Sequence, residues 1–362
     1  MADVQTKNMA ESYPVNGGNG PNSYAQNSCY QKEVVDGAKG MITKAIAEKF
    51  DIGNPLLDCP NLIRIADFGC STGPNTFISV QNIIEAIELK HKSTQQNSKT
   101  LEFHVFFNDL TSNDFNTLFM SLPPSREYFA AGVPGSFHGR VFPKATLHIA
   151  HSSNSLHWLS KIPEEVLDRN SLAWSGKKVH YTGNEKVLEA YSAQFKNDMK
   201  TFLSARALEI VSGGVILFFV GGCEDGFLAS QTCSSMQFGL LASCLVEMAE
   251  LGMISEEKVE SFNVPIYLTS PKELKEVIET NAEFSIERME NFVPYKNPEM
   301  PDCQMLSTHL RVVIEGLISE HFGTEIVEGL FERYTKKMEE NYFVFDMKYR
   351  QEFVIFVCLK RK

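Results

Sequence analysis

Short apolar runs alternate along this chain with segments whose apolar residues recur at helical spacing. Four runs have the length and composition of buried strands: LIRIADF (62–68), EFHVFFND (102–109), ATLHIAHSS (145–153) and GGVILFFVGG (213–222). Between them, TFISVQNIIEAIELKHK (76–92) and VLEAYSAQFKNDMKTFLSARALEIV (187–211) have the pattern of helices. Strands that alternate with helices predict a mostly parallel sheet covered on both faces, which is a Rossmann-like α/β fold.

The segments outside this alternation suggest how the chain is divided. An amphipathic helix is predicted over 31–50, and 226–280 and 307–341 are helical without strands, as expected of a cap over the strand ends. QEFVIFVCLKRK (351–362) predicts a strand at the sheet edge, paired with FSIERMENF (284–292). We therefore expect a mobile arm over 1–22, an α/β core of 23–225, 281–306 and 342–362, and a cap of 226–280 and 307–341.

Composition excludes several classes of protein. The formal net charge of −11 argues against a nucleic-acid partner, because such proteins concentrate Lys and Arg to neutralise phosphates. The chain contains no run of apolar residues long enough to span a bilayer, and its first residues contain no apolar signal segment. Its eight cysteines include no C-x-x-C pair and predict reduced thiols. We expect a cytoplasmic protein with no membrane partner.

The stretch IADFGCSTGPNT (65–76) permits two interpretations. GCSTG fits the G-x-S-x-G pattern of serine hydrolases, with Ser71 as nucleophile. In α/β-hydrolases, however, several strands and an HGGG-type oxyanion loop precede that pattern, and neither is evident in the residues before it. The alternative is a glycine loop after the first strand, where ligands bind in open α/β sheets. The sequence favours this ligand loop.

Two acidic residues at strand ends indicate the type of ligand. Asp67 ends the first strong strand, and Asp109 ends the second, where a carboxylate can accept hydrogen bonds from both ribose hydroxyls. The loop lacks the G-x-G-x-x-G pattern that holds a dinucleotide pyrophosphate. An acidic residue here repels a diphosphate but attracts the ammonium and sulfonium groups of S-adenosylmethionine. The predicted cofactor is therefore S-adenosylmethionine and not NAD.

The chain closely resembles the plant SABATH methyltransferases. The resemblance covers nearly the whole chain through SYAQNSCYQ, ADFGCSTGPNTF, FFNDLTSNDFNTLF, GVPGSFHGRVFP, HSSNSLHWLS and EHFG, in that order. It implies a Rossmann-like class I methyltransferase sheet, mostly parallel with an antiparallel C-terminal edge, under a helical cap. It also implies S-adenosylmethionine-dependent methylation of a small plant carboxylic acid, of the iridoid or terpenoid type, and a homodimer.

The resemblance also implies a set of cofactor contacts. The N-terminal segment and the first loop would enclose the ligand, the second strand end would hold the ribose, and two further loops would border the adenine and the rest of the cofactor. The matching positions are Tyr24, Ser28, Asp67, Cys70, Asn75, Asp109, Leu110, Ser136, Phe137 and Ser153.

On the substrate side, the resemblance implies that Gln31 and Trp158 hold the carboxylate, with His157 beside them. An amide and an indole N–H are donors suited to two carboxylate oxygens. A carboxylate is already ionised near neutrality, so methylation needs no base. Asn154 stands where Tyr is common in the family, and Ile266 stands where several relatives have Gln. These two differences favour a bulkier, less polar acid, whereas the overall resemblance favours an iridoid acid.

Some SABATH relatives carry a magnesium ion beside the cap. The matching positions are Asn170, Glu260, Asn263 and the backbone carbonyl of Phe262, and oxygen ligands of this kind suit magnesium. Asp is more common in the family where Glu260 stands.

Three functions remain open from the sequence. The first is a carboxyl methyltransferase that makes a methyl ester. The second is a methyltransferase for an enol oxygen of an alkaloid or a purine nitrogen. The third is a binding protein that keeps the fold without turnover, which Gln31 and Trp158 disfavour because both residues that would orient a nucleophile are present.

Overall fold

The computed structural model describes residues 14–53, 61–93, 100–182, 184–226, 232–294, 302–346 and 352–362. Seven strands form one sheet: β1 (Leu62–Phe68), β2 (Glu102–Asp109), β3 (Phe129–Pro134), β4 (Leu147–Ser153), β5 (Ile210–Cys223), β6 (Phe284–Phe292) and β7 (Glu352–Arg361). The α-helices are α1 (Tyr24–Asn27), α2 (Cys29–Lys49), α3 (Pro74–Ser93), α4 (Phe115–Met120), α5 (Glu185–Glu209), α6 (Cys233–Glu250), α7 (Glu256–Ser261), α8 (Pro271–Glu279), α9 (Cys303–Phe322) and α10 (Val327–Glu340). Short 3₁₀ turns are η1 (Glu164–Val166), η3 (Thr324–Ile326) and η4 (Tyr342–Phe345).

The sheet has the strand order β3-β2-β1-β4-β5-β7-β6. The five strands β1 to β5 pair in parallel, whereas β7 pairs antiparallel with both β5 and β6. This arrangement confirms the predicted α/β class, its antiparallel C-terminal part and the pairing of 284–292 with the last strand. The edge itself is β6, because β7 lies between β5 and β6. Strand order reverses between β1 and β4, and ligands of open α/β sheets bind at the carboxyl ends of strands at such a point.

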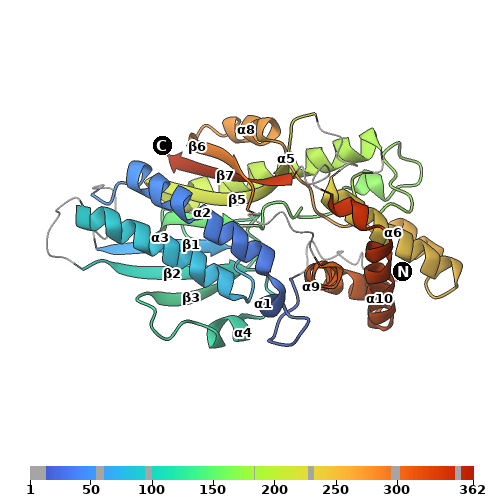
Figure 1. The fold of residues 1–362 in the computed structure, drawn as a ribbon. Coiled ribbons are helices and arrows are strands. Elements are labelled where there is room, and N and C mark those ends of the chain that lie inside the picture. Colours follow the sequence, from blue (N-terminus) through green and yellow to red (C-terminus); the bar gives the residue numbers. More distant parts are fainter. Residues whose placement is uncertain are drawn as a thin grey trace, which may run out of the picture.

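One face of the sheet is covered by α2 and α3, which lie side by side in Figure 1. Their apolar residues recur every three or four positions and are buried, as in Val34, Ala38, Ile42 and Ile46 of α2. The other face is covered by α5 and α8, which contact each other. Leu274, the buried residue at the start of α8, packs in the same hydrophobic cluster as α5. The helices therefore cover both faces of the sheet.

Besides the hydrophobic clusters on the two faces of the sheet, another cluster lies outside the sheet. It is built mainly from α6, α7, α9 and α10, which gather beyond one end of the strands in Figure 1. Helices α9 and α10 contact each other, and α10 also contacts α6. Trp158 and Ile266 pack against this cluster from the side of the sheet. The residue boundaries between core and cap stay a prediction.

Two details differ from the expectation. β3 was not predicted, because FAAGVP (129–134) has few strand-favouring residues and its side chains are not fully buried. Ile210 and Val211 were predicted to end a helix, but they begin β5, which runs for 14 residues. Both residues are β-branched and fit a pleated strand better than a helix end.

The N-terminal segment links helix α9 to the loop between β2 and α4. Asn16 N donates to Val312 O of α9 at 2.9 Å, and Gly18 N donates to the Asp114 carboxylate beside α4 at 3.0 Å. These residues belong to the stretch predicted as a mobile arm, of which 1–13 lie outside the described residues. Segment 14–28 therefore bridges α9 and the strand ends.

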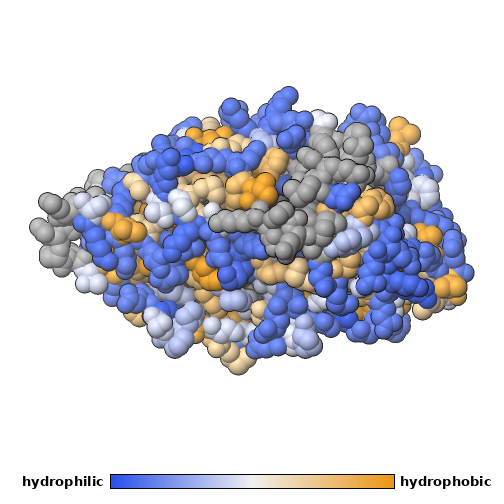
Figure 2. All heavy atoms as spheres, viewed as in Figure 1, coloured by the Kyte–Doolittle hydropathy of each residue, from blue (hydrophilic) through white to orange (hydrophobic). Residues whose placement is uncertain are grey.

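The surface, the helices and the cysteines of the described residues have the following properties. Hydrophilic residues predominate on the face in Figure 2, with apolar residues in small separate groups. Among the described residues, no helix is both long and apolar enough to cross a membrane. The cysteines within the described ranges are all free thiols.

Candidate active site

The loop after β1 has a backbone that only certain residues can form. Gly69 has φ +79°, and a Cβ there would lie 2.1 Å from the Ser155 hydroxyl, so glycine is required for this close approach. Ser71 follows with φ +53°. The amides of Gly69 and Cys70 both donate to Asn108 O, at 2.9 and 3.1 Å. The loop is thus attached to the end of β2, as the ligand-loop interpretation expects.

Asp109 lies directly beside this loop. Its Oδ2 accepts from Ser71 N at 2.7 Å, and its Oδ1 accepts from Leu110 N at 2.8 Å. Burial raises the pKa of the Asp109 carboxyl to about 6; the two backbone donors oppose this shift, and the nearby charge of Asp67 adds to it. A buried carboxyl with a perturbed pKa of this kind is typical of a ligand-binding site.

Asp67 is held from two sides. Its Oδ1 lies 2.7 Å from His151 Nδ1 on the adjacent strand β4, and its Oδ2 accepts a hydrogen bond from the Thr76 hydroxyl. Asp67 and His151 are both buried. The contacts therefore join β1, β4 and α3 at the point where strand order reverses.

The hydrolase interpretation has no supporting geometry. The Asp67–His151 pair resembles two members of a triad, but His151 Nε2 has no hydrogen-bond partner among the described residues. The hydroxyl of Ser71 is buried and likewise lacks a partner within the described ranges. A nucleophilic serine needs a base within hydrogen-bond reach, so Ser71 is a loop residue.

The N-terminal segment closes onto the same loop. Asn75 Nδ2 donates to Ser28 Oγ at 2.8 Å and to Ser28 O at 3.1 Å. A Cβ at Gly73 would lie 2.9 Å from the ring of Tyr24, so the absence of a side chain admits that ring. Burial raises the pKa of the Tyr24 phenol, and the charges of Asp67 and Asp109 add to the shift. The structure therefore brings Tyr24, Ser28, Asp67, Asn75 and Asp109 together.

Cys70 and Leu110 belong to the same group through their backbone positions beside Asp109. Burial raises the pKa of the Cys70 thiol well above its usual value, with help from the charges of Asp109 and Asp67, so the thiol stays protonated. Phe137 lies close to the loop, 3.7 Å from the position of a Cβ on Gly69. Ser136 comes directly before Phe137 in the chain. The residue before Ser136 is Gly135, whose backbone N–H donates to Asp109 O at 2.8 Å.

The segment after β4 leads from the loop to the cap. Asn154 has φ +54°, its amide donates to Phe219 O at 3.0 Å, and its side chain donates to Ser153 Oγ at 3.2 Å. Asn is one of the few residues that adopts this conformation readily. The turn therefore redirects the chain from Ser153 towards His157.

Trp158 faces a cap residue more than a hundred positions away. Trp158 and Ile266 form an antiparallel bridge, with Tyr267 N donating to His157 O at 2.9 Å and Leu159 N donating to Pro265 O at 2.8 Å. Burial lowers the pKa of His157 to about 4, so this imidazole is neutral near pH 7. The segment thus offers an indole and an uncharged imidazole beside Ile266.

Gln31 lies in the first turn of α2, three residues after Ser28, whose hydroxyl accepts a hydrogen bond from the Asn75 side chain. Its amide oxygen is buried and has no hydrogen-bond partner among the described residues. A buried amide oxygen without a protein partner is costly unless a ligand donates a hydrogen bond to it. This oxygen therefore suits a ligand hydroxyl or N–H group, whereas a substrate carboxylate would have to be held by the NH2 group of the same amide.

Three of the predicted magnesium ligands already contact other protein groups. Glu260 forms an ion pair with Arg169, and Asn263 donates to Ser175 Oγ at 3.0 Å. Asn170 bonds to its neighbour Asp168. Asn263 and Asn170 donate through nitrogen, so these contacts do not use the oxygens that would bind a metal ion, whereas a cation at Glu260 would have to compete with Arg169. Within the described ranges, no group of three or more His, Cys, Asp or Glu could hold one.

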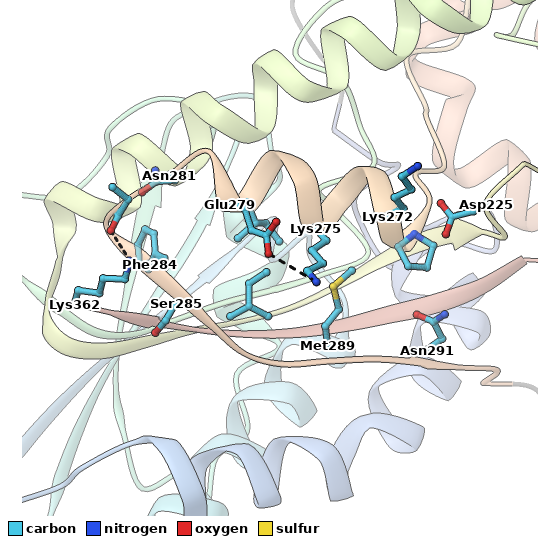
Figure 3. Close-up of a pocket in the computed structure, with 14 residues that line it drawn as sticks. Asp225, Lys272, Lys275, Glu279, Asn281, Phe284, Ser285, Met289, Asn291 and Lys362 are labelled. Atoms are coloured by element: carbon cyan, nitrogen blue, oxygen red, sulfur yellow. Dashed lines mark hydrogen bonds and ion pairs between the residues drawn. The ribbon is translucent and has the colours of Figure 1, made fainter.

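A surface groove lies apart from these residues. It has a volume of about 920 Å³ between α8 and the edge strand β6, and Lys275, Glu279 and Met289 are among the side chains drawn in Figure 3. Lys275 pairs with Glu279, and Lys362 donates to Ala282 O. None of the predicted site residues lines this groove.

Comparison with known proteins shows the family to which the chain belongs. The family model of SAM-dependent carboxyl methyltransferases matches residues 10–362. The chain belongs to this family. Loganic acid O-methyltransferase of Catharanthus roseus is 51% identical over 356 residues, which are 97% of this chain and 95% of the relative. Farnesoic acid carboxyl-O-methyltransferase of Arabidopsis thaliana is 44% identical over 334 residues, which are 92% of this chain and 94% of that protein.

A solved structure supports the same assignment. Loganic acid methyltransferase with SAH has a TM-score of 0.92 and 50% sequence identity, covering 96% of this chain and 99% of that chain. This carboxyl methyltransferase therefore has the class I methyltransferase fold and uses S-adenosylmethionine. The predicted fold, family and cofactor are confirmed.

Sequence reasoning missed several residues that hold the site. Asn108, Asn113, Thr76, Ser155 and His151 form contacts described above or support the loop, as when Asn113 Nδ2 donates to Ser71 O at 3.1 Å. Buried polar residues next to strand ends were the available signal, since such groups need partners. Their partners could not be read from the sequence, because Asp67 and His151 are 84 positions apart.

Proposed function

We propose that this carboxyl methyltransferase esterifies a small plant carboxylic acid of the loganic acid type. The observation that carries the proposal is the 51% identity to loganic acid O-methyltransferase over nearly the full length of both chains. The similarity to farnesoic acid carboxyl-O-methyltransferase supports the wider class, a terpenoid-derived acid. The product is the methyl ester and S-adenosylhomocysteine.

In the proposed reaction, a carboxylate oxygen attacks the sulfonium methyl in line with the leaving sulfur. The new C–O bond takes its electron pair from the carboxylate, and the C–S bond electrons stay on the sulfur, so no proton moves. Catalysis then depends on placing the oxygen behind the methyl group. Gln31 and Trp158 would supply the two neutral donors, and neutral donors hold the ground-state carboxylate less tightly than an ion pair would.

We assign the cofactor contacts as follows. The carboxylate of Asp109 would accept hydrogen bonds from the ribose hydroxyls, with Leu110, Ser136 and Phe137 around the adenine. The other proposed contacts are Tyr24, Ser28, Asp67, Cys70, Asn75 and Ser153. The proximity of Tyr24, Asn75 and Asp109 to one another supports this assignment.

The substrate side of the pocket would be bordered by Asn154, His157 and Ile266. Because burial keeps His157 neutral, it adds no positive charge that would compete for the carboxylate. Ile266 offers no hydrogen bond from its side chain, whereas buried substrate hydroxyls without partners cost about 1–3 kcal/mol each. This chemistry favours an acid with few hydroxyls near Ile266.

Turnover with a panel of acids tests the proposal. The purified enzyme is incubated with methyl-labelled S-adenosylmethionine and loganic acid, farnesoic acid, a purine such as xanthine, and an enolic alkaloid, and products are analysed by mass spectrometry. The proposal predicts labelled methyl esters of one or more acids. Label on the purine nitrogen or enol oxygen alone would contradict it, and so would cofactor binding without any product.

Three further predictions belong to this proposal: a homodimer, a cytoplasmic location and a magnesium ion at Asn170, Glu260, Phe262 and Asn263. No step of the reaction is assigned to magnesium, because Arg169 already neutralises Glu260. Adding Mg²⁺ to EDTA-treated enzyme tests the magnesium prediction, and a rise in Tm or activity would support a magnesium site at these residues. Light scattering in solution tests the dimer, and imaging of a fluorescent fusion tests the location.

A further inference from the structure

Helix α5 carries a stripe of residues that contact both sides of the candidate site. Gln194, Asp198, Phe202 and Arg206 follow one another at intervals of four, so they share one side of the helix. Asp198, Phe202 and Arg206 are buried. Charged side chains such as Asp198 and Arg206 are rarely buried without hydrogen-bond partners. Their partners here are the loop after β3 and the segment that follows Trp158.

Arg206 and Glu209 clamp the loop that follows β3. Their side chains are both 0% exposed and form an ion pair, Nε to Oε2, at 2.7 Å. Arg206 also donates to Phe137 O at 2.9 Å and to Gly139 O at 2.8 Å. The other oxygen of Glu209 accepts from the amides of Val141 and Phe142 at 2.6 and 2.9 Å.

The polar ends of this pair therefore bond to the loop or to each other. The guanidinium also lies over the rings of Phe68, at 4.1 Å from the centroid, and Phe202, at 4.9 Å. A planar fork that bonds one carboxylate and two carbonyls at once is specific to arginine. The pair thus fixes residues 137–142, next to the position assigned to the adenine.

Asp198 holds the other loop in the same way. Its Oδ2 accepts from Ser160 N at 2.9 Å, and its Oδ1 accepts from Ser160 Oγ at 2.7 Å and from Gln194 Nε2 at 2.8 Å. Ser160 lies two residues after Trp158. Because Leu159 is also bonded to Pro265, the backbone after Trp158 is fixed from α5 and from the cap.

The loop after β3 also contacts α5 and the Trp158 segment between the Arg206 and Asp198 contacts. The ring of Phe137 packs edge-on against Phe202 of α5 with centroids 6.4 Å apart. Burial lowers the pKa of the neighbouring His138, while the charge of Asp198 and hydrogen bonds to the backbone of Trp158 and Asp198 oppose that shift. His138, which belongs to the loop after β3, therefore contacts the segment that carries Trp158.

We propose that α5 positions both reactants, through Arg206 and Glu209 for the cofactor and through Asp198 for the carboxylate-holding segment. The inference rests on the proposed function, since it assigns the substrate side to Trp158. These are positioning residues, because they act through the loops and do not touch the reacting atoms. The two anchors are separate, so their loss should affect different kinetic constants.

Two conservative variants separate the anchors. Arg206→Lys keeps the charge beside Glu209 but loses the fork to Phe137 and Gly139, and we expect the Kd for S-adenosylhomocysteine to rise about ten-fold, as when an outer-shell partner of a binding residue is removed. Its kcat at saturating cofactor should change by less than about three-fold. Asp198→Asn should lower kcat with the acid about ten-fold, because misplaced reactants react more slowly, with cofactor Kd unchanged.

A paired variant guards against misfolding. Changing one member of a buried ion pair leaves an uncompensated charge, so Arg206→Met is combined with Glu209→Gln. The amide introduced by Glu209→Gln still has an oxygen for the amides of Val141 and Phe142, whereas Phe137 and Gly139 lose their donor. This double variant should reproduce the cofactor defect of Arg206→Lys. Asn197→Ala, on the exposed side of α5, is the matched control and should match wild type in all constants.

Calorimetry with S-adenosylhomocysteine, steady-state kinetics with a turned-over acid and Tm measurements decide the matter. The proposal requires the cofactor defect in Arg206 variants and the kcat defect in Asp198→Asn. Equal losses of both constants in both variants, in proportion to Tm, would overturn it, and so would wild-type values throughout. If wild type methylates no acid, the proposed function and the Asp198 part fail together, whereas the Kd of the Arg206 variants still decides the cofactor part.

Discussion

Replacing Asp109 by alanine removes the carboxylate assigned to the ribose. Two charge-assisted hydrogen bonds would be lost, each worth about 1.5–3 kcal/mol, so together about 3–6 kcal/mol. That loss corresponds to at least a hundred-fold weaker binding of S-adenosylhomocysteine, since about 1.4 kcal/mol is ten-fold. The loop would also lose its bonds from Ser71 N and Leu110 N to this side chain, which adds to the effect.

The pH dependence of binding provides a second readout from the same residue. With the pKa of Asp109 raised to about 6, the side chain is mostly ionised at pH 7.5 and mostly protonated at pH 5. The carboxylate is the form that accepts two hydroxyl bonds, so affinity should be constant above about pH 7 and fall below pH 6, by up to about ten-fold per pH unit. Asp109→Ala should lose this dependence.

Calorimetric titration with S-adenosylhomocysteine from pH 5 to 8 measures both effects. Tm is recorded at each pH, so that a folded variant is distinguished from an unfolded one. A folded Asp109→Ala protein with wild-type Kd at pH 7.5 would refute the ribose assignment. A wild-type Kd that does not change between pH 7.5 and 5 would refute the raised pKa as a determinant of binding.

Three other substitutions test the remaining assignments. Ser71→Ala should keep methyl transfer within about two-fold and remove no esterase activity, and a large loss of turnover would contradict the loop role. Trp158→Phe replaces the indole by a smaller aromatic ring and deletes the N–H donor, so kcat should fall at least about ten-fold with a small change in Tm; parallel losses would favour a packing role. Ile266→Gln adds a donor and should raise kcat/KM for loganic acid relative to farnesoic acid, and an unchanged ratio would contradict the role of Ile266 in specificity.

Every described strand except β3 was predicted, most of them from runs rich in apolar residues. β1, β4 and β5 are buried on both faces between two helical layers, which selects continuous runs of Val, Ile, Leu and Phe. β3 was missed for the opposite reason, because its residues are small and only partly buried. The start of β5 at Ile210 was misplaced because the β-branched pair Ile210 and Val211 also continues the apolar spacing of α5, and helix ends are the least certain part of such a prediction.

The cofactor loop was predictable because a glycine loop after the first strand and an acidic residue at the end of the second are visible in the sequence, and a parallel sheet places these strand ends side by side. The close approach of Gly69 to Ser155 was not predictable, because the two residues are 86 positions apart. The bridge between Trp158 and Ile266 was not predicted, because the two positions are 108 residues apart; the family resemblance only assigned both residues to the substrate pocket. The interval of four on α5 was readable, but its loop partners at 137–142 and 160 depend on the folded chain.

The most direct test of carboxyl methylation is the fate of the label from methyl-labelled S-adenosylmethionine with loganic acid as acceptor. The account predicts that wild type forms labelled methyl ester, that mild alkaline hydrolysis releases the label as methanol and regenerates the acid, and that Trp158→Phe forms much less product. Label that resists hydrolysis, or binding of cofactor and acid without any transfer to this or another carboxylic acid, would contradict the account.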